Sequence, residues 1–355
     1  MVQKNFQRVA EVLEEAVLNR HIPGAVIAIT TSDETIYKGA FGYAHETKQI
    51  QMKKDTIFDL ASLTKVTSTL PAIMQLQEKG LLDIDDSVSL YLPQLEINHH
   101  EVTIKHLLTH TSGFRPDIKF YRLNAKRDEV VDLISNLGDR KPVETEVIYS
   151  DLNFILLGKI VEQIVQLPLD VYTAKSIYEP LEMNDTYFNP PESKKNRIAA
   201  TEFMDSIQDF QWGKVHDENT FHFGGVSGHA GLFSTAEDLT KYARMLLNGG
   251  DFGKGNLLSA TSIELTKKSF TKGLNLNRGL GWQLYDPSSF SGQFFQDGFG
   301  HTGFTGTSIW NSPKRDVAII FLTNRVHFGR STNIHRLRKI IHNLVSITMD
   351  GATRR

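Results

Sequence analysis

Residues 58–65 read Phe-Asp-Leu-Ala-Ser-Leu-Thr-Lys and place Ser62 and Lys65 three positions apart, at the entry to a helix predicted over 62–79. Residues i and i+3 share one face of a helix, so the lysine amine can lie beside the serine hydroxyl. A desolvated neutral lysine can remove the proton that makes serine a poor nucleophile. The stretch therefore indicates a nucleophilic serine, with a helix-capping serine and a solvated lysine as the alternative.

The same spacing occurs again at Ser269-Phe270-Thr271-Lys272. This second copy runs into Gly273 and is surrounded by polar residues, which is a poor setting for a buried lysine. Spacing alone does not decide between the two copies.

A tyrosine occupies the junction Tyr149-Ser150-Asp151, directly before a helix predicted over 151–165. From such a junction a phenol can project into a cleft, and a neighbouring cationic lysine makes its proton easier to remove. Tyr187 has a similar setting, although Pro190 and Pro191 follow it closely and indicate a surface turn. Either ring could equally be a packing residue.

The segment Gly300-His301-Thr302-Gly303-Phe304-Thr305-Gly306 is predicted to open a strand over 304–310. Small residues let a substrate lie against a strand edge, where free N–H groups can bind an oxyanion. The alternative is a glycine-rich turn in which His301 is an ordinary surface histidine.

Predicted strands lie near both ends of the chain, and predicted helices fill the middle. The strands are expected at 25–29, 35–43, 281–285, 304–310 and 317–323. The helices are expected within 1–20, at 62–79, 129–137, 151–165 and 169–177, from 236 onward, and over 334–345. This order predicts an α/β fold of the α+β type, with an antiparallel sheet built from both termini, flanking helices and a mainly helical insert.

We expect a single unit over 1–355, with a sheet subdomain formed by 1–60 and 235–350 and a mainly helical subdomain over 61–234. The chain of 355 residues is long enough for either one large domain or two. No linker rich in proline, glycine or serine separates the two parts.

Composition excludes several classes of function. With 39 basic and 41 acidic side chains the net charge is −2. The chain therefore lacks the excess of basic residues that would indicate nucleic-acid binding. The sequence has no cysteine, which excludes disulfides and thiolate chemistry. His106 and His110 lack the glutamate of a zinc-binding His-Glu-x-x-His pattern and are expected to cap and pack a short helix.

No stretch of sequence reaches the roughly 18 apolar residues of a membrane span, so no integral membrane segment is expected. Glutamates at 11, 14 and 15 interrupt the first helix, unlike the apolar run of a secretion signal. The expected location is therefore the cytoplasm, or outside it if a leader has been removed.

Taken together and in this order, Ser-x-x-Lys, Tyr-x-Asp and His-Thr-Gly resemble the serine β-lactamase and penicillin-binding-protein superfamily. The pattern is most similar to its class C β-lactamase, D-Ala-D-Ala carboxypeptidase and family VIII esterase branch. The resemblance covers nearly the whole chain, and further family-like stretches lie at 22–25, 106–113 and 228–235. Residues 215–219, Val-His-Asp-Glu-Asn, resemble a Gram-positive subgroup that includes a cell-wall-recycling amidase.

The resemblance implies two-step acyl transfer through a covalent acyl-enzyme on Ser62. Lys65 and Tyr149 would share the general acid and base work. The N–H groups of Ser62 and Phe304 would form the oxyanion hole. Residues implied in substrate binding are Asp151, His301, Thr302 and Gly303. Neither a metal nor an organic cofactor is implied.

Two residues depart from the family pattern. Asp151 stands where the family has asparagine, and its carboxylate favours a charged Lys65 and opposes a neutral lysine base. His301 stands where the family has a lysine that meets a carboxylate. With an ordinary pKa of about 6.5, His301 would need protonation to do so, and acylation by penicillins should then improve as the pH falls.

The main functional expectation is a serine hydrolase that acts on peptidoglycan-type peptides or β-lactams, with small molecules or cell-wall peptides as partners. The alternatives are an intracellular carboxylesterase or a muropeptide (N-acetylmuramoyl-L-alanine) amidase. A binding protein without activity on the same fold is a third possibility, which the presence of Ser62, Lys65 and Tyr149 disfavours.

Overall fold

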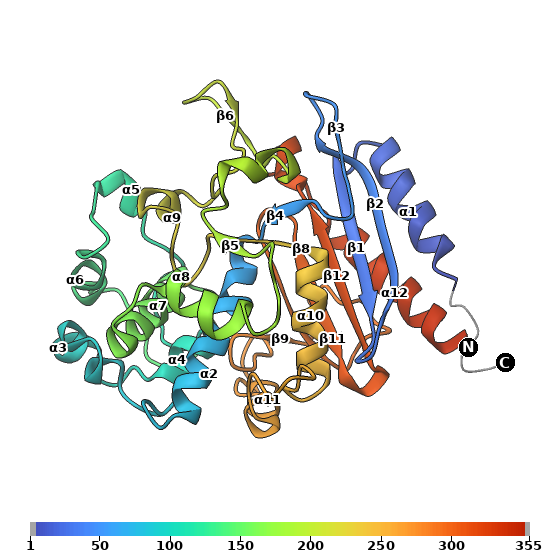
Figure 1. Ribbon diagram of the computed structural model, residues 1–355. Coiled ribbons are helices and arrows are strands. Elements are labelled where there is room, and N and C mark those ends of the chain that lie inside the picture. The colour runs from blue at the N-terminus through green and yellow to red at the C-terminus, as the bar shows by residue number, and fades with distance from the viewer. Residues whose placement is uncertain (1–4, 352–355) are drawn as a thin grey trace.

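The computed structural model describes residues 5–351 and has a mixed α/β fold built on an antiparallel sheet (Figure 1). Its strands are β1 Gly24–Thr30, β2 Thr35–His45, β3 Ile50–Gln51, β4 Ile57–Asp59, β5 Tyr187–Phe188, β6 Phe203–Met204, β7 Asp209–Phe210, β8 Leu232–Thr235, β9 Gln283–Leu284, β10 Phe299–Thr302, β11 Ser308–Ser312 and β12 Val317–Thr323. Its helices are α1 Gln7–Leu18, α2 Leu70–Glu78, α3 Glu96–His99, α4 Ile104–Thr109, α5 Phe120–Leu123, α6 Val130–Ser135, α7 Asp151–Val165, α8 Leu169–Thr173, α9 Glu218–His222, α10 Ala236–Leu247, α11 Ala260–Thr266 and α12 His335–Gly351.

The main sheet joins the two ends of the chain, as the sequence predicts. Seven strands follow the order β3-β2-β1-β12-β11-β10-β9, and every neighbouring pair is antiparallel. The central pair is β1 with β12, in which Ile27 lies opposite Phe321. Strands from opposite termini therefore form the middle of the sheet.

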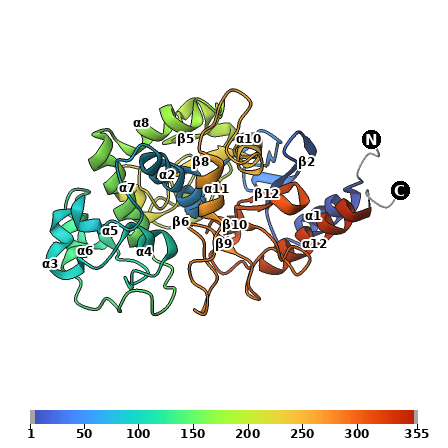
Figure 2. The same cartoon turned by 90° about the horizontal axis from the view of Figure 1, so that it is seen from below.

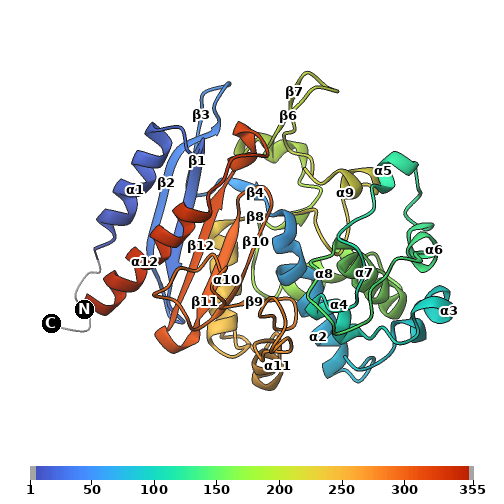
Figure 3. The same cartoon turned by 180° about the vertical axis from the view of Figure 1, so that it is seen from behind.

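Helices cover both faces of this sheet, and both central strands are fully buried. Ala25, Ile27 and Ile29 of β1 pack in the apolar cluster that includes residues of α1 and α12. Val26 and Ala28, which point the other way, pack in the larger cluster that includes α10 and the helical region. Figure 3 shows α1 and α12 side by side over one face of the sheet.

The helical region lies to one side of the sheet and contains α2 to α9 (Figure 2). Within residues 5–351 no helix is long and apolar enough to cross a membrane. The predicted helix 151–165 is confirmed as α7. The helix predicted from 236 onward is α10. Thr235 caps its N-terminus, because Thr235 Oγ1 accepts a hydrogen bond from the Asp238 N–H at 3.2 Å. Part of the first helix prediction, residues 1–4, lies outside the described residues.

One strand prediction near the C-terminus is wrong in position. The predicted strand 304–310 is split: residues 299–302 form β10, and the next strand, β11, begins only at Ser308. Residues 303–307 make the tight turn between them, in which the Gly306 N–H donates to the Gly303 carbonyl at 3.1 Å. His301 therefore lies at the end of one strand and does not open another.

Candidate active site

The backbone changes direction sharply just before Ser62. Ala61 has a φ of +46°, which is an uncommon conformation for a residue with a side chain. The buried Asp59 carboxylate stabilises this bend, because its Oδ1 accepts from the Ala61 N–H at 2.8 Å and its Oδ2 from the His216 N–H at 2.6 Å. Ser62 then enters a short 3-10 turn at the mouth of the helical segment.

The helix predicted over 62–79 is regular only from α2 onward. Residues 65–69 form a wider π turn, a feature often found at functional sites. Pro71 has no N–H to donate to the residue four positions earlier, which accounts for the change of helix type.

Lys65 is fully buried and lies against Ser62, as the spacing predicts. Its Nζ donates to Ser62 Oγ at 3.0 Å, to Asp151 Oδ1 at 2.7 Å and to the His229 carbonyl at 3.1 Å. All three of its N–H donors can therefore be satisfied.

The charge state of Lys65 follows from these contacts. Burial by itself would lower the pKa of Lys65, but the Asp151 carboxylate and the Tyr149 phenol together raise it above its ordinary value. Lys65 is therefore an ammonium at neutral pH. This confirms the expectation that Asp151 opposes a neutral lysine base.

Asp151 was expected to contact substrate. Its carboxylate instead forms the salt bridge with Lys65, and Asp151 is not among the residues that line the cavity over Ser62. We propose that it positions Lys65 and maintains its charge.

Tyr149 contacts both Lys65 and a buried histidine. Lys65 Nζ is 5.0 Å from the centre of the Tyr149 ring, and the centre of the His110 ring is 4.6 Å from it. His110 Nδ1 accepts from the Ser150 N–H at 3.1 Å, which fixes the backbone next to Tyr149. His106 and His110 do cap a short helix, α4, as expected, but His110 also supports Tyr149.

The turn after β10 is tied to the segment before Ser62. Thr305 Oγ1 donates to the Asp59 carbonyl at 2.7 Å, and Thr307 Oγ1 donates to the Leu60 carbonyl at 2.9 Å. A Cβ atom on Gly303 would lie 2.3 Å from the same Leu60 carbonyl, so only glycine fits there. This packing brings Phe304 close to the nucleophile, as an oxyanion hole made by Ser62 and Phe304 requires.

His301 differs from its expected state. It is buried, and its Nδ1 lies 2.8 Å from the Thr302 carbonyl, which can only accept, so Nδ1 carries the proton. Burial, and then the nearby Arg278 and Lys65 charges, hold the pKa of His301 well below its ordinary value. This shift favours a neutral imidazole and opposes the expectation that acidification protonates His301 to hold a carboxylate.

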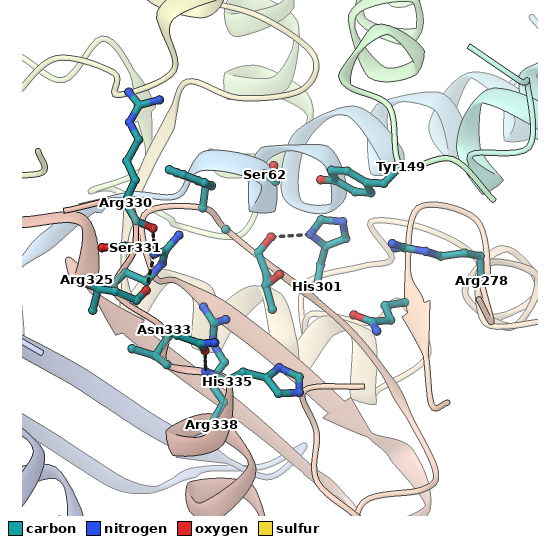
Figure 4. A pocket seen from close by; sticks show the side chains of 16 residues that line it. Ser62, Tyr149, Arg278, His301, Arg325, Arg330, Ser331, Asn333, His335 and Arg338 are labelled. Carbon is teal, nitrogen blue, oxygen red and sulfur yellow. Dashed lines mark hydrogen bonds between the residues drawn. The ribbon is translucent and has the colours of Figure 1, made fainter. Parts of the chain in front are cut away.

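A cavity of about 530 Å³ opens over Ser62 and is also lined by Tyr149, His301, Thr302, Gly303 and Phe304. Six of the predicted site residues thus line one space. Figure 4 shows the Tyr149 hydroxyl directed toward Ser62, with His301 below them.

Arg278 is a further cation of this site, beside Tyr149, and sequence reasoning missed it. The side chain is buried, lines the cavity and lies 5.4 Å from the centre of the Tyr149 ring. Its Nε and Nη1 have no hydrogen-bond partner in the described part of the chain. A buried guanidinium with free donors suits a carboxylate, which it can bind through two hydrogen bonds. Arg278 lies in a polar, irregular segment without a helical or strand pattern, so the sequence did not indicate that its side chain enters the site.

Asp151, Asp217 and His229 bring potential metal ligands within 4.8 Å of one another. Lys65 already lies against this group through Asp151 and the His229 carbonyl. His229 Nε2 lies 3.1 Å from Asp217 Oδ1, and Asp217 caps α9 by accepting from the Thr220 N–H at 2.7 Å. We assign the cluster to holding the Lys65 charge.

The competing motifs are not brought to this site. Ser269 is exposed and donates to Asn277 Oδ1 at 2.7 Å, and Lys272 is exposed as well. Tyr187 pairs with β8 and donates to Asp185 Oδ1 at 2.6 Å. Neither Ser269 nor Tyr187 lines the cavity that contains Ser62.

Fold and site together define the class of serine hydrolases that includes β-lactamases and penicillin-binding proteins. Residues 5–342 match the Beta-lactamase family, and the chain belongs to this family.

Two relatives with different names are similar to this chain in sequence. The chain is 32% identical to an N-acetylmuramyl-L-alanine amidase of Bacillus subtilis, over 91% of this chain and 82% of that one. It is 31% identical to a protein of Escherichia coli named as a D-alanyl-D-alanine carboxypeptidase, over 86% of this chain and 79% of that one.

Solved structures share the fold. A penicillin-binding protein homologue from Pyrococcus abyssi has a TM-score of 0.79 at 24% identity, covering 97% of this chain and 77% of that one. A class C β-lactamase from Rhodobacter sphaeroides has a TM-score of 0.77 at 21% identity, covering 96% and 98%.

Proposed function

We propose that the protein hydrolyses an amide bond in peptidoglycan fragments whose leaving group carries a carboxylate, through an acyl-enzyme on Ser62. The observation that supports this best is the buried Lys65 ammonium, held between Ser62 Oγ at 3.0 Å and Asp151 Oδ1 at 2.7 Å, beside Tyr149. A charged Lys65 cannot accept the serine proton, so that task passes to Tyr149.

In the first step, Tyr149 acts as the general base and takes the Ser62 proton, and Oγ attacks the amide carbon. The N–H groups of Ser62 and Phe304 stabilise the oxyanion. The C–N bond then breaks, and the departing amine takes the proton from Tyr149. In the second step, water gives its proton to Tyr149, attacks the ester carbon and releases the acid, and Ser62 regains its proton.

Arg278 is the proposed partner of the substrate carboxylate, and neutral His301 offers Nε2 as a hydrogen-bond acceptor. Two scissile bonds fit this chemistry. One is the D-Ala-D-Ala bond, as the names of the carboxypeptidase relatives suggest. The other is the bond between N-acetylmuramic acid and L-alanine, which the Bacillus relative favours because its similarity covers more of the chain. Hydrolysis of β-lactams or simple esters would use the same acyl-enzyme.

Covalent labelling tests the nucleophile. We expect a fluorescent penicillin or a 4-nitrophenyl ester to add one acyl group to Ser62, located by mass spectrometry of peptides. Ser62→Ala should lose all labelling, and Ser269→Ala, which removes the serine of the second motif, should keep it. Labelling that survives Ser62→Ala would overturn the proposal.

Products from a defined muropeptide identify the bond. Incubation with N-acetylmuramoyl-pentapeptide should release either D-alanine or the intact stem peptide, and mass spectrometry distinguishes the two. Release of neither, by a protein that is labelled at Ser62, would exclude peptidoglycan amides as substrates.

A further inference from the structure

The cavity over Ser62 has a second basic end that the proposed reaction does not use. Figure 4 shows Arg278 on one side of Ser62 and His301, and Arg325 and Arg338 on the opposite side. All three arginines line the same cavity. Ser62 therefore lies between two groups of cations.

Arg338 of α12 is more than nine-tenths buried. Its Nη2 donates to the Gly306 and Thr307 carbonyls at 2.8 and 3.0 Å, while its Nε has no hydrogen-bond partner among residues 5–351. No carboxylate of the described residues forms a salt bridge with it. A buried cation without an anionic partner costs substantial free energy.

Arg325 adds a second cation beside it. Its guanidinium carbon lies 4.8 Å from the centre of the Phe304 ring, and Nη1 donates to the Arg330 and Thr332 carbonyls at 3.0 and 2.5 Å. The proximity of Arg325 contributes to a lowered pKa for Arg338, after burial as the larger cause. Two like charges thus face one wall of the cavity.

Arg330, on the same wall, behaves differently. It donates to Glu202 Oε2 at 2.8 Å and to Glu218 Oε1 at 2.7 Å, so its charge is balanced by the protein. Glu202 is further engaged by His216 at 2.9 Å. Glu202 also acts electrostatically on Arg325, but no carboxylate of residues 5–351 forms a salt bridge with Arg325 or Arg338, so both keep an uncompensated charge toward the cavity.

We propose that Arg325 and Arg338 form a second anion subsite, so that the preferred substrate carries two acidic groups, one on each side of Ser62. Arg278 binds one group and the Arg325–Arg338 pair binds the other. An anion bound there would reduce the repulsion between the two guanidinium groups and accept hydrogen bonds from their free N–H groups. The proposal rests on the proposed function only in placing the reacting carbonyl at Ser62.

Equilibrium binding to Ser62→Ala protein tests the subsite without chemistry. The probes are α,ω-dicarboxylates from succinate to suberate, each paired with its monomethyl ester, measured by titration calorimetry. We expect at least one chain length to bind about tenfold or more tightly than its own monomethyl ester. Because this protein cannot be acylated, the result is independent of the labelling test above.

Further variants of the Ser62→Ala protein show which arginines cause the preference for dicarboxylates. Arg325→Gln and Arg338→Lys should each reduce the dicarboxylate preference to about twofold or less. Arg336→Gln removes the same charge from an exposed position on α12 and should leave the preference unchanged. Equal binding of dicarboxylate and monoester at every length would overturn the proposal. A preference that survives Arg325→Gln would overturn it as well, even if Arg338→Lys does not fold.

Discussion

Lys65 keeps its charge inside the protein because the surroundings replace the water that it loses. The fully buried ammonium has a carboxylate, Asp151, at 2.7 Å and a carbonyl at 3.1 Å, and a second carboxylate, Asp217, has an oxygen within 4.8 Å of that of Asp151. Removing one partner of such a buried pair leaves an uncompensated charge. At the scale of single residues, Asp151 therefore determines which form of Lys65 is present.

The first prediction concerns Asp151→Asn. Loss of the carboxylate removes the charge that raises the pKa of Lys65, so that pKa falls. Because the ammonium is needed beside Tyr149, the alkaline limb of the profile of kcat/KM against pH should move by about 1–3 units toward lower pH. A pH series with a neutral 4-nitrophenyl ester measures the shift. The exposed Asp33→Asn serves as control, and an unmoved limb in Asp151→Asn would contradict the assignment.

The second prediction concerns Arg278 and His301. The test compares 3-carboxyphenyl acetate, whose leaving group carries a carboxylate, with neutral phenyl acetate. Because the pKa of His301 lies well below its ordinary value, the ratio of the two kcat/KM values should stay constant within about twofold from about pH 5.5 to 8. Arg278→Gln should lower the ratio about tenfold or more throughout. A ratio that rises on acidification of the wild type would show that His301 is protonated and binds the carboxylate.

At the scale of elements, the turn between β10 and β11 connects the sheet to the nucleophile. Thr305 and Thr307 fasten it to the backbone before Ser62, and Arg338 fastens it to α12. The ring of Phe304 packs against the Arg325 guanidinium. Phe304 therefore belongs to the proposed oxyanion hole through its N–H group and contacts the proposed second anion subsite through its side chain.

The third prediction tests this turn with Gly303→Ala. The new Cβ would lie 2.1 Å from Thr307 Oγ1 and 2.3 Å from the Leu60 carbonyl, so the turn must move. Displacing the Phe304 N–H should lower kcat by about 10²–10³ with little change in KM, as for loss of one oxyanion donor. Gly138→Ala is the matched control, since nothing lies within 4 Å of its Cβ. Unchanged kcat in Gly303→Ala would remove the turn from the mechanism.

At the scale of the whole molecule, one apolar core spans the sheet and the helical region. Val26 and Ile320 of the sheet belong to the same buried cluster as Leu70 of α2 and Leu156 of α7. We propose on this basis that residues 1–355 form one unit, with a sheet subdomain of 1–60 and 235–350 and a helical subdomain of 61–234.

The fourth prediction is that both parts unfold together. In a Trp212→Phe background the fluorescence of Trp282 and Trp310 reports on the sheet subdomain alone, while far-UV circular dichroism follows the helices of both parts. The two signals should give coincident urea transitions at neutral pH. Separate midpoints would show that the two parts are independently stable domains.

The fifth prediction concerns acid stability. His342 of α12 is fully buried against the rings of Phe290 and Phe295, and burial lowers its pKa to about 3. The unfolded chain takes up a proton below about pH 6.5 and the folded one does not, so stability falls on acidification through that window. Each such histidine contributes about 1.4 kcal/mol per pH unit. His342→Leu should reduce the slope of unfolding free energy against pH by about this amount, whereas the exposed His21→Leu should change it less.

Local sequence patterns were sufficient to predict some features of the fold and of the candidate site. The contact of Ser62 with Lys65 follows from helical spacing, the packing of α7 from its apolar period, and the capping of α4 from its own short sequence. These interactions join residues that are close in the chain, so the amino-acid order alone determines them. Strands β1 and β12 of the sheet were also predictable, because each is a long apolar run, although their pairing joins opposite ends of the chain.

Tertiary structure decided the features that join distant segments. It alone shows that Tyr149 and not Tyr187 faces Ser62, and that Arg278 enters the cavity from an irregular segment. It also makes His301 neutral, because protonation depends on burial and on the charges of Arg278 and Lys65 nearby. Burial and long-range charge arise only once the chain has folded, so residue type and spacing could name candidates for this site but not their charge states or the second group of arginines.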